Sequence, residues 1–161
     1  MKKITGLVVL ATMLGYPLLG WSGEGSVGCR TPSFCNWADL KGKSYEGQDV
    51  TEMSFEAADM TGVSLKNAKA DHVVFHIARL DKADLSGADL AGATFFSGSA
   101  SKANFRGANL KGVNFTRTNL SGANLKDARI DNSTIFIHAN LSGTTWVDGR
   151  VCAEGSDGVC K

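Results

Sequence analysis

Large apolar residues recur every five positions between residues 40 and 135, with small or polar residues between them. The central apolar positions are Leu40, Tyr45, Val50, Phe55, Met60, Leu65, Ala70, Phe75, Leu80, Leu85, Leu90, Phe95, Ala100, Phe105, Leu110, Phe115, Leu120, Leu125, Ile130 and Ile135. On an α-helix a step of five advances about 500°, so these residues would form no stripe. On a straight β-strand an odd step sends successive residues to opposite faces. The chain is therefore expected to bend once per repeat, so that five residues form one side of a closed coil.

The spacing of the phenylalanines predicts how many sides each coil has. Phenylalanine recurs at intervals of twenty, at Phe55, Phe75, Phe95 and Phe115. This interval predicts four sides per coil, with like side chains stacked from one coil to the next. Twenty repeats then form about five to six coils, and five coils at the usual strand spacing of ~4.8 Å are about 24 Å tall.

The residues around each central position follow one motif. The clearest copies are Ala38-Asp39-Leu40, Ala58-Asp59-Met60, Ala83-Asp84-Leu85, Ala88-Asp89-Leu90, Ala103-Asn104-Phe105, Ala108-Asn109-Leu110 and Ala123-Asn124-Leu125. In this respect the sequence resembles the pentapeptide-repeat family, whose motif is Ala-Asp/Asn-Leu-x-x. The resemblance implies an all-β fold, a right-handed quadrilateral β-helix in which the central residue and the residue two before it point inward.

Asparagine occupies the position before the central residue in five consecutive repeats. The series is Asn104, Asn109, Asn114, Asn119 and Asn124. Asparagine side chains readily accept hydrogen bonds from backbone N–H groups two residues further on. We therefore expect these side chains to hold the turning backbone rather than a ligand.

The N-terminus has the layout of a secretory signal peptide. Two lysines precede an apolar stretch from Ile4 to Leu19, and small residues follow at Gly20 and Ser22. We expect cleavage after Ser22, which divides the chain into a signal peptide (1–22), an N-terminal cap (23–37), a β-helix (38–151) and a C-terminal cap (152–161). The alternative is an uncleaved anchor, although the stretch is shorter than the ~20 residues that a membrane span needs. The opening Met-Lys-Lys is typical of bacteria, so a periplasmic or secreted protein is predicted.

Four cysteines lie outside the regular repeats, at Cys29, Cys35, Cys152 and Cys160. An even number in an exported chain favours disulfides. Bonded cysteines have Cα atoms within ~7 Å, whereas the two ends of the stack are expected to be about 20 Å or more apart. The local pairs Cys29–Cys35 and Cys152–Cys160 are therefore favoured, and a four-cysteine zinc site is disfavoured for the same reason.

Charge and composition bear on the function classes. The chain has 17 basic and 16 acidic residues, and loss of Lys2 and Lys3 with the leader leaves 17 − 2 = 15 basic residues. A near-neutral chain lacks the basic stripe that grips nucleic acid. The leading interpretation is a non-catalytic structural or protein-interaction module of the bacterial envelope. The alternative is a DNA mimic that binds gyrase, as in cytoplasmic members of the family, whose surfaces are strongly acidic.

No sequence motif places a nucleophile beside a base, so no catalytic residue, cofactor or metal site is predicted. His72 and His76 are four residues apart, but this spacing converges on a metal only in a helix. We expect them instead to stack on Glu52 and Glu56, twenty residues earlier, on a solvated face. The partner is expected to be an unknown protein or a second copy of the chain, and not nucleic acid or, after cleavage of the leader, a membrane.

The register of the repeats slips once. Leu141 follows Ile135 after six residues, and Trp146 and Val151 then resume the step of five. We expect one extra residue near His138, which would form a bulge at the entry to the terminal coil. At the opposite end, Trp37 and Phe34 are expected to cover the stack.

Outward-pointing apolar residues gather on one of the four predicted sides. They flank the side built on the phenylalanines, and they are Val74, Ile77, Phe96, Phe136 and Ile137. A contiguous exposed apolar patch usually marks an interface. The alternatives are that another part of the chain covers this side, or that the slip turns Phe136 and Ile137 inward.

Overall fold

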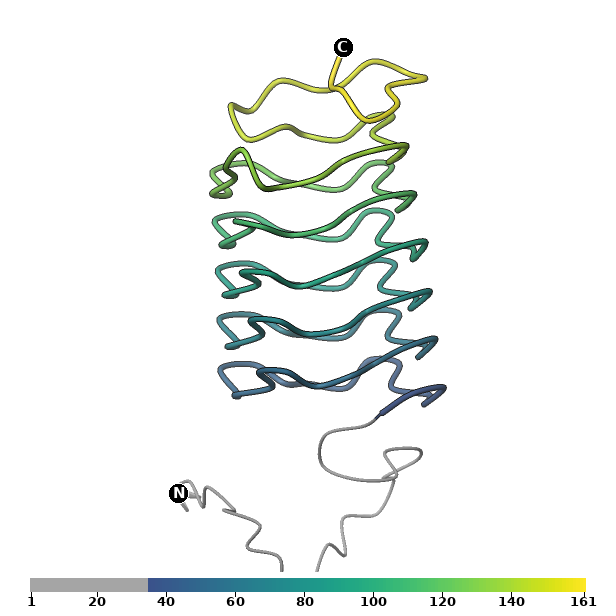
Figure 1. Cartoon of the computed structure of the whole chain (residues 1–161), viewed down its shortest axis with the longest axis vertical. Helices are drawn as coiled ribbons and strands as arrows, with labels where there is room; N and C mark the ends of the chain where they lie inside the picture. Colours follow the sequence, from purple (N-terminus) through teal and green to yellow (C-terminus); the bar gives the residue numbers. More distant parts are fainter. Residues whose placement is uncertain (1–34) are drawn as a thin grey trace, which may run out of the picture.

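The computed structural model describes residues 35–161, which form a stack of coils with the C-terminus at its upper end (Figure 1). Within these residues there is no helix, and the backbone pairs through isolated parallel bridges rather than long strands. The bridges join residues twenty apart, from Asp39↔Asp59 to Asn109↔Arg129. Each coil therefore holds four pentapeptides, and the predicted period of twenty is confirmed. No helix that could span a membrane occurs among residues 35–161.

Each pentapeptide forms one side of a coil and the turn that follows it. The residue before the central one bridges to the neighbouring coils, and two turn residues follow the central one. Asn114 Oδ1 accepts a hydrogen bond from the Thr116 N–H at 2.9 Å, as the motif predicts. The same bond forms at Asn104, Asn119 and Asn124. Asn109 differs, because its Oδ1 is buried without a hydrogen-bond partner among the described residues; its Nδ2 donates to Asp89 Oδ1 at 2.7 Å, as that of Asn104 does to Asp84 Oδ1 at 3.1 Å.

The interior of the coils is filled by the central residues and by the small residues two positions before them. The central phenylalanines are fully buried and stack in a column. Their ring centroids are 5.6 Å apart for Phe55–Phe75, 4.8 Å for Phe75–Phe95 and 5.0 Å for Phe95–Phe115. We call the side of the coils that carries this column the phenylalanine side. Its central residues are Cys35, Phe55, Phe75, Phe95, Phe115 and Phe136.

The register slip lies earlier than the sequence predicts. Asn114 bridges to Ile135, twenty-one residues away, and Phe136 rather than Ile135 stacks on Phe115, at 5.2 Å between ring centroids. Ile135 points outward and is 38% exposed. The predicted stacking of Ile135 on Phe115 and the bulge near His138 are therefore wrong.

Asp131 is the extra residue, and local hydrogen bonds explain why the chain accommodates it there. Asp131 Oδ1 accepts from the Ser133 N–H at 3.0 Å and the Ser133 hydroxyl at 2.6 Å. It also accepts from the Gly112 N–H of the coil below, at 3.3 Å. Thr134 then takes the inward position, where its hydroxyl donates to the Leu110 carbonyl at 2.9 Å. The Asp131 carboxylate and the Thr134 hydroxyl thus satisfy the backbone around the insertion, and the Ser133 hydroxyl bonds to that carboxylate.

The C-terminal segment folds back over the last coil instead of continuing it (Figure 1). Thr145 pairs antiparallel with Val151, and Asn140 pairs antiparallel with Asp157. Val151 was expected to occupy a central position, but it is 64% exposed, because the chain reverses at Asp148-Gly149. The β-helix therefore ends before the predicted boundary at residue 151.

Both ends of the described chain carry cysteines in disulfides. Cys152 and Cys160 are bonded to one another, which is the local pairing that the sequence favours. Cys35 is also in a disulfide, whereas Cys29 and Phe34 lie outside the described residues. Trp37 was expected to cover the N-terminal end, but its side chain is 79% exposed. Its backbone sits at a turn with φ of 62°, which directs the side chain outward.

Candidate interaction surface

The exposed apolar side chains concentrate on the phenylalanine side. The described residues include six large, exposed hydrophobic side chains: Trp37, Ile77, Ile135, Ile137, Val151 and Val159. The first four occupy outward positions of this side. On the other three sides, the equivalent positions of the regular pentapeptides carry polar or charged residues or glycine, apart from Ala91 and Val147. The apolar surface therefore belongs to one side of the stack and is not scattered over it.

The five residues that the sequence nominates do not all lie on this surface. Ile77 and Ile137 are 57% and 58% exposed, and Val74 and Phe96 are half-buried at outward positions. Phe136 points inward and packs against the core, so its predicted outward position is wrong. The slip turns Phe136 inward, while Ile137 remains outside. Ile135 is the surface residue that sequence reasoning missed, because it was assigned to the core.

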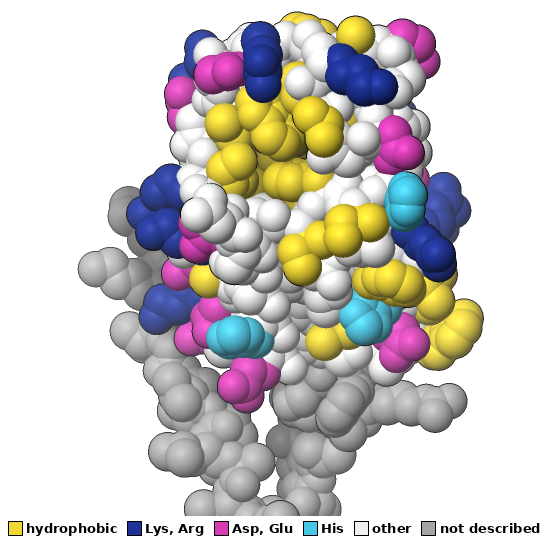
Figure 2. Space-filling model, turned by 45° about the horizontal axis from the view of Figure 1, so that its top comes forward, with side chains coloured by type: hydrophobic (Ala, Val, Ile, Leu, Met, Phe, Trp, Pro, Cys, Tyr) yellow, Lys and Arg dark blue, Asp and Glu magenta, His cyan; other side chains and the backbone are white. Residues whose placement is uncertain are grey.

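The surface rises from the middle of the stack to its C-terminal end. Figure 2 shows hydrophobic side chains gathered in a hollow near that end, with further hydrophobic side chains below it. Phe96 packs edge-on against His76, with 6.0 Å between ring centroids, and His76 Nε2 lies 3.0 Å from Thr94 Oγ1. His76 is thus engaged by its neighbours in the following coil. The expected stacking partner of His76 was Glu56, in the preceding coil.

Ile77 adopts a backbone conformation that disfavours its side chain. It occupies the second turn position with φ of 57°. A β-branched residue is a genuine outlier in this left-handed region, where the cost is about 1–2 kcal/mol. Elsewhere in the described chain this turn position carries glycine or unbranched residues, and Ile77 is its only β-branched occupant. Since Ile77 is also mostly exposed, its side chain adds little core packing to offset that cost.

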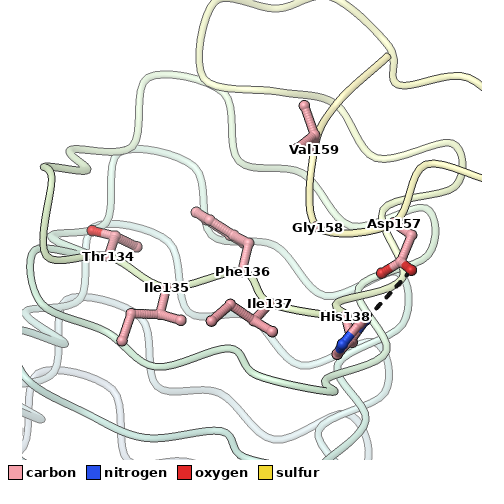
Figure 3. A pocket seen from close by; sticks show the side chains of 8 residues that line it. All are labelled: Thr134, Ile135, Phe136, Ile137, His138, Asp157, Gly158 and Val159. Carbon is pink, nitrogen blue, oxygen red and sulfur yellow. Dashed lines mark ion pairs between the residues drawn. The ribbon is translucent and has the colours of Figure 1, made fainter.

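A hollow of about 500 Å³ opens at the upper end of the phenylalanine side. Figure 3 shows its residues, which come from the last coil and from the returning tail. They are Thr134, Ile135, Phe136, Ile137, His138, Asp157, Gly158 and Val159. The two ionisable residues among them, His138 and Asp157, contact one another at 3.6 Å between Nδ1 and Oδ2. The hollow is therefore apolar at its floor, with one histidine and one aspartate in contact at its rim.

The carboxyl groups whose pKa is lowered lie outside the phenylalanine side. On the neighbouring side, burial works to raise the pKa of Asp81, but hydrogen bonds from Ser99 and Ser101 outweigh it and hold the pKa below its usual range. Asp81 Oδ1 accepts the two hydroxyl protons at 2.5 and 2.8 Å. Among residues 35–161, no three histidine, cysteine or acidic side chains converge as a metal site would require. Asp81 thus links its own coil to Ser99 and Ser101 of the next coil.

The chain belongs to the pentapeptide-repeat family. The sequence profile of the family Pentapeptide repeats matches residues 58–95 and 101–135, in eight copies. A pentapeptide-repeat protein from the thylakoid lumen of Arabidopsis thaliana is 34% identical. That similarity covers 70% of this chain and 68% of the plant protein, with a TM-score of 0.36.

Other similar solved structures have lower sequence identity. The pentapeptide-repeat protein Rfr23 from the cyanobacterium Cyanothece 51142 is 19% identical, covering 71% of this chain and 91% of its own, with a TM-score of 0.43. QnrB1, a plasmid-mediated fluoroquinolone resistance protein, is 18% identical, covering 80% and 70%, with a TM-score of 0.37. Neither likeness identifies an activity or a partner of this chain. No curated protein matches it.

Proposed function

We propose that this protein is an exported, non-catalytic interaction module of the bacterial envelope, and that its phenylalanine side is the docking surface for a partner protein. The scaffold would be the right-handed quadrilateral β-helix that family membership implies. Its interior is packed with aliphatic and aromatic side chains that are almost completely buried. Because the interior of such a coil is filled, only its outward side chains, held at fixed spacing, are available to contact a partner.

Export is supported by the leader-like N-terminus and by the cysteines. Residues 1–22 carry the charged, apolar and small-residue regions of a signal peptide. Cys152 and Cys160 form a disulfide, and no free cysteine occurs among residues 35–161. Disulfides persist in oxidising compartments such as the periplasm. We expect the mature protein to begin at Gly23, which mass measurement of the intact secreted chain would reveal.

Ile77 is the observation that carries the assignment of the working side. A strained, exposed, β-branched residue is costly for folding, and such outliers persist where function favours them. Ile77 lies one coil below Phe96, and Ile135 and Ile137 lie two coils above Phe96. Their alignment on one side, facing away from the core, is what a protein-binding patch requires.

A DNA-mimic function is the less favoured alternative. Such a surface needs a strong excess of acidic side chains, whereas acidic and basic residues are nearly equal in number along this chain. Several carboxylates are also paired with cations, as in the contacts of Asp59 with Lys41 and Arg79 at 3.2 and 3.3 Å. These pairs reduce the negative field that a phosphate mimic would present.

Crosslinking in the native compartment tests the proposal. The double variant Ile77→Ser/Phe96→Ser should lose crosslinks that the wild-type protein forms, while its unfolding transition stays cooperative. Val151→Ser is the control, because Val151 is 64% exposed, close to the 57% of Ile77, but lies outside the phenylalanine side. If the wild-type protein is monomeric and the double variant keeps every crosslink, this side is not the working surface.

A further inference from the structure

The last coil is capped on two of its sides and open on the phenylalanine side. Over the adjacent side, the tail completes the ladder, because Leu141 N–H donates to the Ser156 carbonyl at 2.9 Å and Gly143 N–H donates to the Cys152 carbonyl at 3.0 Å. The Gly158 N–H donates to the Ala139 carbonyl at 2.9 Å. The tail therefore already pairs with this edge as an added strand does.

The tail turns away where Gly158 meets the backbone of Phe136 and His138. Cys160 is bonded back to Cys152, and the Ala153 N–H donates to the Lys161 carbonyl at 3.0 Å. Gly158 marks the turning point with φ of +65°, and a Cβ added there would lie 2.9 Å from the Phe136 carbonyl oxygen. The disulfide and the glycine thus end the cap at the border of the hollow (Figure 3).

The edge beyond that border carries hydrogen-bonding groups without backbone partners in residues 35–161. They are the Phe136 N–H, the His138 N–H and the Thr134 carbonyl. One coil below, the equivalent groups are filled by a single residue: Ile135 accepts from the Phe115 N–H at 2.8 Å and donates to the Val113 carbonyl at 2.9 Å. One residue of an incoming strand could make the same two bonds with Phe136 and Thr134. Unpaired strand edges are templates for such pairing.

The column of stacked rings ends at the same place. Each buried phenylalanine from Phe75 to Phe115 has a ring above and below it, whereas Phe136 has Phe115 below and only the tilted Trp146 beside it, at 5.2 Å. Phe136 is half-buried, and the hollow lies where the next ring of the column would be. An apolar side chain of the incoming strand would fill that position.

We infer that the hollow binds an extended, uncharged segment of a partner protein, which adds a strand along the Thr134–His138 edge and places one apolar side chain on Phe136. This inference rests on the proposed interaction function and names the part of the partner that the upper end recognises. Eight residues line the hollow, whereas a stable folded interface takes about 20–30 residues from each partner. The hollow is therefore too small for a second copy. The only two ionisable residues that line the hollow, His138 and Asp157, already contact one another, so the lining has no cluster of like charges for an ionic ligand.

Selection from a random dodecapeptide library displayed on phage, with the purified full chain as bait, tests this inference. Peptides with an apolar residue inside an extended, Pro-free sequence should be enriched. Their synthetic forms should bind Val159→Lys/Ile137→Lys at least tenfold more weakly than wild type. Val151→Lys is the matched control and should bind them unchanged, because Val151 is as exposed as Val159 but lies outside the hollow.

Amide hydrogen exchange separates strand pairing from simple apolar contact. A bound peptide should slow exchange of the Phe136 amide at least tenfold, and N-methylation of the pairing residue should abolish this protection. The inference is overturned if no peptide is enriched, if the lysine variant binds equally well, or if the Phe136 amide is unaffected. It is also overturned if that amide is already protected in the free monomer or by self-association, since the chain itself would then occupy the edge. Crosslinking of the Ile77→Ser/Phe96→Ser variant tests the proposed function separately, so failure of the peptide experiments would not by itself overturn that function.

Discussion

The regular coils up to Ile130 and the last coil, residues 131–149, are built from the same pentapeptide but differ in completeness. From Asp59 to Asn124, each bridging residue pairs with the coil below and the coil above, as Val74 does with Ser54 and Thr94. In the last coil, an extra residue shifts the register, the tail pairs two sides and the phenylalanine side stays open. The coils from Asp59 to Asn124 are therefore closed to further backbone pairing on both faces, whereas the last coil leaves the groups of its phenylalanine side unpaired among residues 35–161.

A second contrast lies within the phenylalanine side itself. Its inner column obeys the repeat, with rings in contact from Phe55 to Phe136. Its outward positions, which are polar in most repeats, carry exposed isoleucines at Ile77, Ile135 and Ile137. Substitution of the inner residues is expected to lower the free energy of unfolding. Substitution of the outer residues should weaken partner binding without lowering that free energy.

The largest expected effect separates a regular coil from the last one. Phe115→Ala removes a fully buried ring and should lower the free energy of unfolding by about 3–5 kcal/mol. Phe136→Ala removes a half-buried ring at the open end and should cost clearly less, about 1–2 kcal/mol. Denaturant unfolding of both variants provides the comparison. Equal losses would show that the last coil is packed like the others.

A smaller effect is expected from opening the tail. Cys152→Ser/Cys160→Ser removes a disulfide between residues eight apart, and should lower the unfolding free energy by about 2 kcal/mol through the short closed loop. The amides of Leu141 and Gly143, which donate to the tail, should then exchange faster than those of the middle coils. Unchanged exchange at these two amides would mean that the cap holds without its disulfide.

Acid should weaken the insertion, because the ionised carboxyl of Asp131 accepts the hydrogen bonds that hold it. The Ser133 hydroxyl, together with the Ser133 and Gly112 N–H groups, holds the pKa of Asp131 below its usual range against the opposing effect of burial. A lowered folded pKa stabilises the protein above the unfolded value of about 3.9, and this contribution is lost as the pH falls through the folded pKa. Asp131→Asn should therefore flatten the loss of stability below about pH 4, as measured by unfolding midpoints. Ser133→Ala, which removes the main donor, should flatten it in part; a profile identical to wild type in both variants would contradict this account.

The fold could be predicted because the five-residue period constrains nearly every backbone bond. The coil number, the stacked phenylalanines and the side-chain bonds of Asn104, Asn114, Asn119 and Asn124 follow from the repeat. The slip could not be placed from apolarity alone, since Ile135 and Phe136 are both suited to the core. The unbroken phenylalanine column was the available signal, because it favours Phe136 above Phe115.

The structure of the two ends and of the outer surface was harder to predict from the sequence. The reversal that exposes Val151 has a local signal in Asp148-Gly149, a pair typical of tight turns. The exposure of Trp37 had no such signal, because an aromatic residue suits an end cap as well as an open surface. The unpaired groups of Thr134 and Phe136 depend on where the tail turns away, which requires the geometry of Gly158.

The central claim is that Ile77 serves binding rather than folding, and the unfolding free energy of Ile77→Asn tests it most directly. Asparagine tolerates φ of 57° and occupies the same turn position at Asn67, where φ is 55°. The account predicts that the variant is more stable than wild type by about 1 kcal/mol, because strain is relieved and little core packing is lost. A variant less stable than wild type by 1 kcal/mol or more, on the order of a lost buried contact, would show that Ile77 supports the fold and would contradict the claim.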